Sequence, residues 1–237
     1  MKIERPIIAL DFPNREVTLN FLKRFSNEKS LFVKIGMELY YSEGRQLVQE
    51  IIDLGHDVFL DLKLHDIPHT VQAAAKVLGK LGVKMITVHA AGGQEMMMAA
   101  KDGLISGSIN NNVPKVLAIT QLTSTSEDNM HKEQLINTSL EKSVLNYAKL
   151  AQKSGMDGVV CSAQEAKQIT TVTSNDFLRV TPGIRLSGNK MDDQKRVMTP
   201  DQAAKQQSSA IVVGRAITQS NNPVETYELI KYLWENN

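Results

Sequence analysis

Eight short apolar segments recur along the chain at fairly even spacing, and longer mixed segments separate them. Most are continuous apolar runs rather than alternating ones, as expected for parallel strands that are covered on both faces. The runs cover residues 7–11, 32–36, 58–63, 85–90, 116–120, 158–162, 177–181 and 210–215. This pattern predicts a sheet of eight parallel strands.

The segments between these runs have the length and patterning of helices. Residues 44–54 and 133–153 are amphipathic, and residues 70–81 are rich in Ala, Lys and Leu. Thr199-Pro200 and Asn222-Pro223 each place a capping residue before a proline, as at a helix start. Strands that alternate with helices eight times predict a (β/α)₈ TIM barrel, formed as a single domain by residues 1–237. An open, doubly wound α/β sheet is the alternative.

Composition narrows the class of protein further. Lys and Arg number 27 against 26 Asp and Glu, and this balance gives no global field that would attract nucleic acid or an acidic membrane. The single cysteine, Cys161, excludes an internal disulfide framework, and its apolar surroundings in the sequence predict a core thiol. We see no signal peptide and no apolar stretch of membrane-spanning length. We therefore expect a cytoplasmic protein.

The third apolar run ends in a cluster of charges. Asp61 and Lys63 are two residues apart, so they share one face of a strand, and Asp66 follows where the strand should end. Burying charge costs roughly several kcal/mol per ion even when it is paired, so stability alone rarely explains such a cluster. Acids on both sides keep the lysine protonated. This lysine is suited to proton donation or anion binding rather than to nucleophilic attack.

Other charged residues are predicted at the same rim of the barrel. Asp11 ends the first run, Lys34 lies inside the second, and His89 ends the fourth. A lysine within an apolar strand needs a partner, and Asp61 is the natural one. Each residue alone could be a structural ion pair, but together at the carboxyl end of a barrel they favour an active site.

Two further features belong to this end of the barrel. Gly214-Arg215 ends the eighth run, where barrels often bind phosphate through backbone N–H groups, and the Arg215 guanidinium would add a bidentate contact. The connections 121–132 and 182–198 are longer than a minimal barrel needs, and they are interpreted as functional lids or as surface insertions.

A metal site is not favoured by the sequence. His65 and His69 are four residues apart, but Pro68 between them favours a loop or a helix start, and no Glu follows His65. We therefore expect no zinc.

The motif Asp61-Leu-Lys63-Leu-His-Asp66-Ile-Pro-His-Thr70 closely resembles the signature of the orotidine 5′-phosphate decarboxylase family. His69 departs from this pattern, because Asn is expected there, whereas Asp66 and Thr70 are intact. Further blocks similar to the family's occur along nearly the whole chain, at 8–11, 32–36, 180–185, 192–194 and 212–215.

This resemblance implies a cofactor-free enzyme that converts orotidine 5′-monophosphate to uridine 5′-monophosphate, the last step of de novo UMP biosynthesis. It implies that Lys63 protonates the C6 carbanion and that Asp61 faces the departing carboxylate. It also implies a homodimer with shared sites, in which Asp66 and Thr70 reach the partner's site. The implied substrate contacts are Asp11 and Lys34 at the ribose, Thr123 at the pyrimidine, and Pro182, Arg185, Gln194, Gly214 and Arg215 toward the phosphate and its closing loop.

Two other interpretations remain open at this stage. A metal-dependent sugar-phosphate aldolase or synthase of the same superfamily would share the Asp-x-Lys motif and the phosphate end. Those relatives use an acid near the second strand as a magnesium ligand, whereas this chain has Lys34, which would repel the metal. A non-catalytic binder of phosphorylated ligands would have little use for the charged cluster of Asp61, Lys63 and Asp66.

Overall fold

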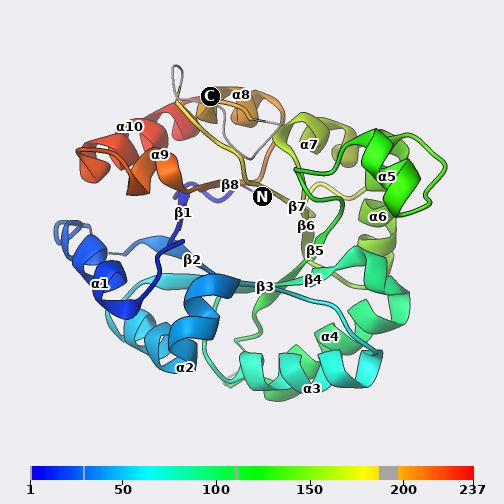
Figure 1. The fold of residues 1–237 in the computed structure, drawn as a ribbon, viewed down its shortest axis with the longest axis horizontal. Coiled ribbons are helices and arrows are strands. Elements are labelled where there is room, and N and C mark those ends of the chain that lie inside the picture. Colours follow the sequence, from blue (N-terminus) through cyan, green and yellow to red (C-terminus); the bar gives the residue numbers. More distant parts are fainter. Residues whose placement is uncertain (1, 29, 110–111, 187–196) are drawn as a thin grey trace.

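The computed structural model describes residues 2–28, 30–109, 112–186 and 197–237. Within these residues eight parallel strands close into a barrel in sequence order, and helices surround it (Figure 1). The barrel is the predicted (β/α)₈ fold, and each predicted apolar run overlaps one strand. The strands are β1 (Ile7–Ala9), β2 (Phe32–Gly36), β3 (Asp57–Leu64), β4 (Met85–His89), β5 (Lys115–Ile119), β6 (Gly158–Val160), β7 (Leu178–Thr181) and β8 (Ala210–Val213).

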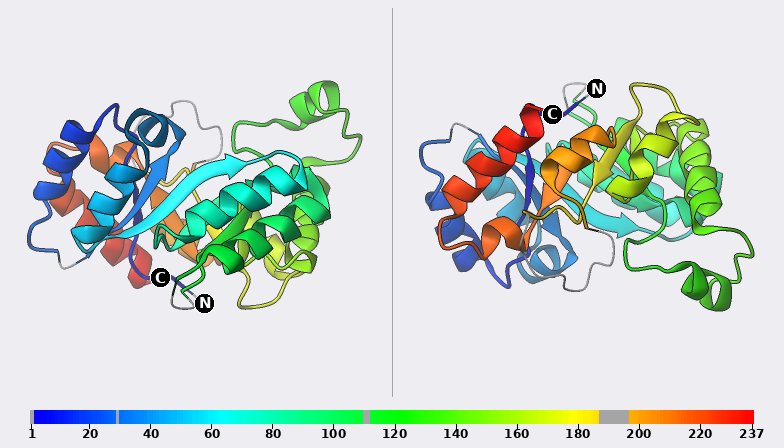
Figure 2. Two further views of the ribbon diagram at one scale, coloured as in Figure 1. Left: turned by 90° about the horizontal axis from the view of Figure 1, so that it is seen from below. Right: turned by 90° about the horizontal axis from the view of Figure 1, so that it is seen from above.

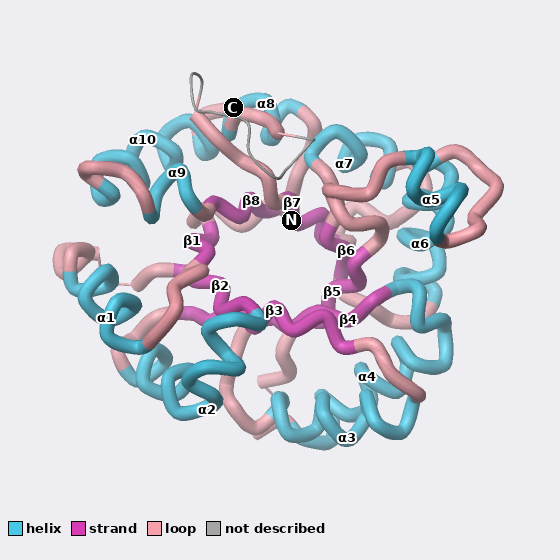
Figure 3. The backbone as a smooth tube through the Cα atoms, in the orientation of Figure 1, coloured by secondary structure: helices cyan, strands magenta, loops and turns pink. Residues whose placement is uncertain are grey.

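Closure depends on the pairing of the first strand with the last. Ile7 of β1 pairs with Phe32 of β2 on one side and with Val212 of β8 on the other. Because every strand has two neighbours, the barrel leaves no unpaired sheet edge. The tube in Figure 3 shows the strands as a continuous inner ring inside the helices.

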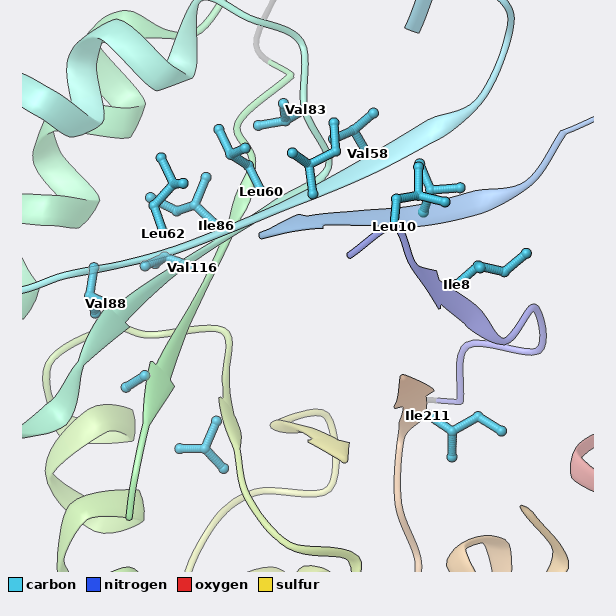
Figure 4. Packing of buried hydrophobic residues seen from close by; sticks show 14 of the residues in the cluster. Ile8, Leu10, Val58, Leu60, Leu62, Val83, Ile86, Val88, Val116 and Ile211 are labelled. Carbon is cyan, nitrogen blue, oxygen red and sulfur yellow. The ribbon is translucent and has the colours of Figure 1, made fainter. Parts of the chain in front are cut away.

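Two groups of buried side chains explain why the strand sequences are continuously apolar. Inward-facing residues such as Ile7, Phe59 and Leu117 fill the barrel interior. Residues on the other strand face, including Leu60, Leu62 and Ile86, pack under the helices (Figure 4). A strand buried on both faces has no position for an alternating polar residue, so the charges of β2 and β3 stand out.

The helices follow the strands around the barrel. Those over the first half are α1 (Arg15–Lys23), α2 (Met37–Asp53), α3 (Pro68–Gly79) and α4 (Gly93–Gly107), with a short 3-10 helix, η1, at Ala90–Gly92. The second half has α5 (Glu127–Glu133), α6 (Leu140–Lys153), α7 (Ala163–Thr170), α8 (Pro200–Lys205), α9 (Arg215–Thr218) and α10 (Pro223–Glu235). Thr199 forms the predicted capping box of α8, and the Asn222 side chain caps α10 as expected.

Two helix predictions differ from the structure. The predicted helix 133–153 begins instead at Leu140, because Ser139 caps it by accepting a hydrogen bond from the Lys142 N–H. The helix predicted at 44–54 continues back to Met37 across a kink at Gly44, whose φ of 66° suits glycine.

The predicted long connection after β5 is real but not wholly irregular. It contains the short helix α5, whose N-cap is Ser126, and it stands out from the body of the barrel (Figure 2). The connection after β7 lies partly outside the described residues. Among the described residues, no helix is long and apolar enough to cross a membrane.

Candidate active site

A cavity of about 620 Å³ opens at the carboxyl ends of the strands. It collects residues from all parts of the sequence, because the carboxyl ends of parallel strands meet at one end of a barrel. The predicted site residues that line it are Asp11, Lys34, Asp61, Lys63, Thr123, Pro182, Arg185, Gly214 and Arg215.

Two predicted residues, Asp66 and Thr70, are not part of this lining. Asp66 and Thr70 are exposed at the start of α3, outside the set of described residues that border the cavity. Asp66 Oδ1 accepts a hydrogen bond from the Ile67 N–H at 2.6 Å. Gln194 lies outside the described residues. Asp66 therefore does not flank Lys63 within its own chain. The second acid beside the lysines Lys34 and Lys63, after Asp61, is Asp11.

Four charged side chains form a connected array at the floor of the cavity. Lys34 Nζ lies 3.0 Å from Asp11 Oδ1 and 3.8 Å from Asp61 Oδ2. Lys63 Nζ lies 2.9 Å from the same Asp61 oxygen. The predicted pairing of Lys34 with Asp61 is confirmed, although Asp11 is the closer partner. Two cations and two anions balance each other in this array.

Because Gly36 has no side chain, it leaves room for the ion pair between Lys34 and Asp11. A Cβ at this position would lie 3.1 Å from Lys34 Nζ and 3.3 Å from Asp11 Oδ1. That spacing is tighter than ordinary van der Waals contact, so a side chain here would displace the ion pair. Gly36 also pairs with Asp61 in the sheet, and this places the end of β2 beside the charged end of β3.

Asp61 is buried within the array, at 9% exposure. Burial alone would raise its pKa, but the nearby Lys34 and Lys63 cations outweigh burial and hold the pKa below its ordinary value. The Thr87 hydroxyl also contributes by donating to Asp61 Oδ1 at 2.8 Å. The carboxylate is therefore ionised at neutral pH.

Lys63 is held in an unusual backbone conformation. Its φ is 53°, in the left-handed region that costs a non-glycine residue roughly 1–2 kcal/mol. The register between β3 and β4 shifts here, from Leu60 opposite Ile86 to Leu64 opposite Val88. The Lys63 N–H donates to Thr87 Oγ1 at 2.8 Å. Thr87 was not predicted, because a threonine within an apolar strand gives no signal of its own in a single sequence.

The loop after β7 is anchored at both of its described ends. Arg185 N–H donates to the Met198 carbonyl at 3.0 Å, and Met198 N–H donates to the Gly183 carbonyl at 3.1 Å. Gly183 has a φ of 81°, which suits glycine. Pro182 and Arg185 thus stay at the cavity wall. At the end of the neighbouring strand β8, Gly214 precedes α9 and Arg215 begins it.

The first residues of the connection after β5 also border the cavity, beside Thr123. Gln121 is buried, and its amide donates to Gln134 Oε1 at 3.0 Å and to Ser143 Oγ at 3.2 Å. These bonds tie the strand end to the α5 segment and to α6. Gln121 was not predicted as a site residue, although its place directly after an apolar run could have indicated one.

The histidines near the array do not form a metal site. The His65 ring lies 5.3 Å from the His89 ring, while His69 is exposed. Burial, with repulsion from His65 and Lys63, holds the pKa of His89 below its ordinary value. In the part of the chain that is described, no three His, Cys, Asp or Glu side chains are grouped so as to hold a metal ion.

The cavity can therefore do two things chemically. Its floor presents a lysine ammonium that is fixed by a buried carboxylate, which suits proton transfer to an anionic carbon. Its rim carries two arginines, Arg185 and Arg215, which suit a phosphate.

Comparison with known proteins decides the family. The family model described as orotidine 5′-phosphate decarboxylase / HUMPS matches residues 4–230. The chain belongs to this family. Its family relatives include the orotidine 5′-phosphate decarboxylase of Ligilactobacillus salivarius, to which it is 61% identical over 99% of both chains. It is also 56% identical to the protein of the same name from Enterococcus faecalis, over 98% of both chains.

The fold of the family agrees with the barrel described above. A crystal structure of orotidine 5′-phosphate decarboxylase from Lactobacillus acidophilus is 44% identical and superposes with a TM-score of 0.89. The match covers 98% of this chain and 99% of that one. The predicted (β/α)₈ barrel and the predicted family are confirmed, and the open doubly wound sheet is excluded.

Proposed function

We propose that the chain decarboxylates orotidine 5′-monophosphate to uridine 5′-monophosphate in the cytoplasm, as the last step of de novo UMP biosynthesis, without a cofactor. The observation that carries this proposal is the pairing of Lys63 with a buried, ionised Asp61 at the cavity floor. Membership in the decarboxylase family and the arginines at the cavity rim support the same substrate.

In this proposal Lys63 is the proton donor. Breaking the bond between C6 and the carboxylate leaves the electron pair on C6 and releases neutral CO₂. The Lys63 ammonium stabilises that carbanion and then transfers a proton to C6, and solvent returns the lysine to its charged form. Asp61 faces the substrate carboxylate, and the repulsion between them eases as CO₂ departs, so the array favours the transition state over the bound substrate.

The remaining lining residues would bind the parts of the nucleotide that do not react. Asp11 and Lys34 hold the ribose hydroxyls, and Thr123 contacts the pyrimidine. Gln194, Arg215 and the Gly214 backbone would hold the phosphate. Arg185 belongs to the closing loop, and Pro182 is a further substrate-binding residue beside it. Phosphate binding far from C6 would supply energy for closure and for assembly of the site.

The proposed working unit is a homodimer with shared sites. Asp66 and Thr70 are exposed next to Ile67, a large apolar side chain that is 66% exposed. Asp66 of the partner subunit would then complete the charge array beside Lys63. These exposed side chains leave the end of β3 accessible to a second subunit.

A direct assay tests the proposed reaction. The full-length protein is mixed with orotidine 5′-monophosphate, and ultraviolet absorbance is followed as the pyrimidine loses its carboxylate. We expect conversion to uridine 5′-monophosphate with release of CO₂. Binding without conversion would contradict the proposal and favour a non-catalytic binder.

The proposal also predicts that activity needs no metal, because Lys34 occupies the place where a metal-using relative would need an acid. The same assay is repeated after dialysis in excess EDTA, with a matched sample dialysed without chelator. We expect equal rates. A loss of rate that magnesium restores would support the metal-dependent aldolase or synthase interpretation instead.

A further inference from the structure

Thr87 contacts both members of the ion pair at the cavity floor, although it is fully buried in β4. Its Oγ1 lies 2.8 Å from Asp61 Oδ1 and 2.8 Å from the Lys63 backbone nitrogen. One side chain therefore joins the carboxylate of Asp61 to the main chain of Lys63.

The direction of these hydrogen bonds is fixed by chemistry. A hydroxyl has one hydrogen, and an ionised carboxylate can only accept. The Thr87 proton therefore points to Asp61, and a lone pair of the same oxygen accepts the Lys63 N–H. A hydroxyl can fill both roles at once, whereas a methyl group of the same size can fill neither.

The strand register makes Thr87 the residue that faces the irregular part of β3. Leu60 pairs with Ile86 and Leu64 pairs with Val88, so Thr87 stands opposite the three residues Asp61, Leu62 and Lys63. Within that segment Lys63 adopts its left-handed φ of 53°. A conformation of this kind persists only when its surroundings hold it, and the Thr87 oxygen is placed to do so.

We propose that Thr87 is a positioning residue for the decarboxylation, which holds the strained Lys63 backbone and the Asp61 carboxylate at their working separation. This inference rests on the proposed function. Thr87 acts through Asp61 and Lys63, and its effect belongs to the chemical step rather than to substrate binding.

Three variants separate positioning from simple stability. Thr87→Val removes the hydroxyl and keeps the shape, while Thr87→Ser keeps the hydroxyl and loses a methyl group. Ser209→Ala is the matched control. Ser209 is buried before β8, at the opposite end of the barrel, and its Oγ accepts the Arg179 N–H at 3.1 Å. Thr87→Val and Ser209→Ala therefore each deprive one buried backbone N–H of its acceptor.

We expect Thr87→Val to lower kcat by about 10- to 100-fold, since small displacements of reacting groups have effects of this order. Its KM, and its Kd for uridine 5′-monophosphate, should stay within about threefold of the wild-type values, because the ribose and phosphate contacts are unchanged. Thr87→Ser should keep kcat within about threefold. Ser209→Ala should lower the melting temperature without changing kcat.

Three results would overturn the inference: a Thr87→Val kcat within threefold of wild type, a Thr87→Ser kcat as low as that of Thr87→Val, or an equal loss of kcat in Ser209→Ala. If Thr87→Val does not fold, Thr87→Ala removes the same hydroxyl without adding bulk and is judged by the same criteria. The wild-type assay keeps the two proposals apart. A wild-type protein without decarboxylase activity would refute the proposed function, whereas an active wild type with an equally active Thr87→Val would refute the role of Thr87.

Discussion

At the scale of single residues, the site depends on how charged side chains are paired at the buried floor of the cavity, where an unpaired charge would be unfavourable. Asp61 has two lysines and a threonine hydroxyl within reach, so its ionisation is favoured despite burial. Removing one partner from such a cluster leaves an unpaired buried charge, which costs more than the pair itself contributes. Substitutions within the array should therefore affect both stability and chemistry, and their tests need a measurement of each.

The Lys63→Ala variant should lose turnover by about 10²-fold or more, the scale at which a positioned general acid contributes. It should still bind uridine 5′-monophosphate, because the ribose and phosphate contacts lie elsewhere in the cavity. Steady-state kinetics and calorimetric titration of the product measure the two effects. Lys84→Ala is a suitable control, since Lys84 pairs with Asp57 directly before β4, at the other end of the barrel. A Lys63→Ala turnover within tenfold of wild type would show that another group donates the proton.

The lowered pKa of Asp61 predicts how stability depends on pH. Because the folded pKa lies below the unfolded value of about 3.9, the carboxylate contributes stability that is complete above that value. The contribution is lost as pH falls through the folded pKa. We expect the difference in unfolding free energy between wild type and Asp61→Asn to be constant above about pH 5 and to shrink below about pH 4.

Urea denaturation of both proteins at a series of pH values measures this difference in unfolding free energy. The other acidic side chains are the same in both proteins, so their contributions cancel in the difference. If burial prevailed and the pKa of Asp61 were raised, the unfolding free energy of wild type would instead increase relative to that of Asp61→Asn as pH falls from about 7 to 5.

The sequence predicted the charged residues of the site because charge within an apolar strand is conspicuous. Asp11, Lys34, Asp61 and Lys63 all line the cavity as expected. Thr87 could not be found in this way, since its importance depends on the shifted register between β3 and β4, which is a property of the folded sheet. The contribution of Asp66 stays a prediction, because in its own chain it lies outside the cavity lining.

At the scale of elements, strands were easier to predict than helix boundaries. A strand buried on both faces needs a continuous apolar run, and the runs at β2 and β3 are marked clearly in the sequence. Residues 133–153 carry helical periodicity in part, but Leu135 has a φ of 57° and Ser139 starts α6 anew. An amphipathic pattern does not reveal where one helix ends and the next begins unless the cap is recognised.

The junction of β8 and α9 carries a prediction at this scale. Arg215→Ala removes a charge-assisted contact of roughly 1.5–3 kcal/mol, so kcat/KM for orotidine 5′-monophosphate should fall about 10-fold or more. Orotidine, which lacks the phosphate, should react with both proteins at nearly the same low rate. Arg215→Lys keeps the charge but loses the fork, so its kcat/KM should be intermediate. Equal losses with both substrates would contradict a phosphate contact.

At the scale of the whole molecule, the barrel places its charge array at one end and leaves Asp66 and Thr70 exposed beside it. A site that borrows an acid from a second subunit makes a sharp prediction for mixed dimers. Lys63→Ala and Asp66→Ala should each be nearly inactive alone. In a heterodimer one site carries both changes and the other carries neither, so activity should return on subunit exchange.

Random mixing of equal amounts makes half of the dimers heterodimers, each with one intact site, so activity should approach about a quarter of wild type. Native mass spectrometry checks that heterodimers form. The control is the Lys63→Ala protein alone, taken through the same subunit-exchange procedure. Heterodimers without recovered activity would mean that Asp66 acts in its own subunit or not at all.

The sole thiol of the chain offers a way to follow these events in time. Cys161 follows β6, borders the cavity and is 1% exposed, so a thiol reagent reaches it only through the cavity or when the barrel around β6 opens. Its labelling rate therefore reports access to the cavity wall, and the native sequence needs no engineered probe. A nucleotide that occupies the cavity should slow labelling in proportion to its occupancy, which would report binding even in variants that no longer turn over.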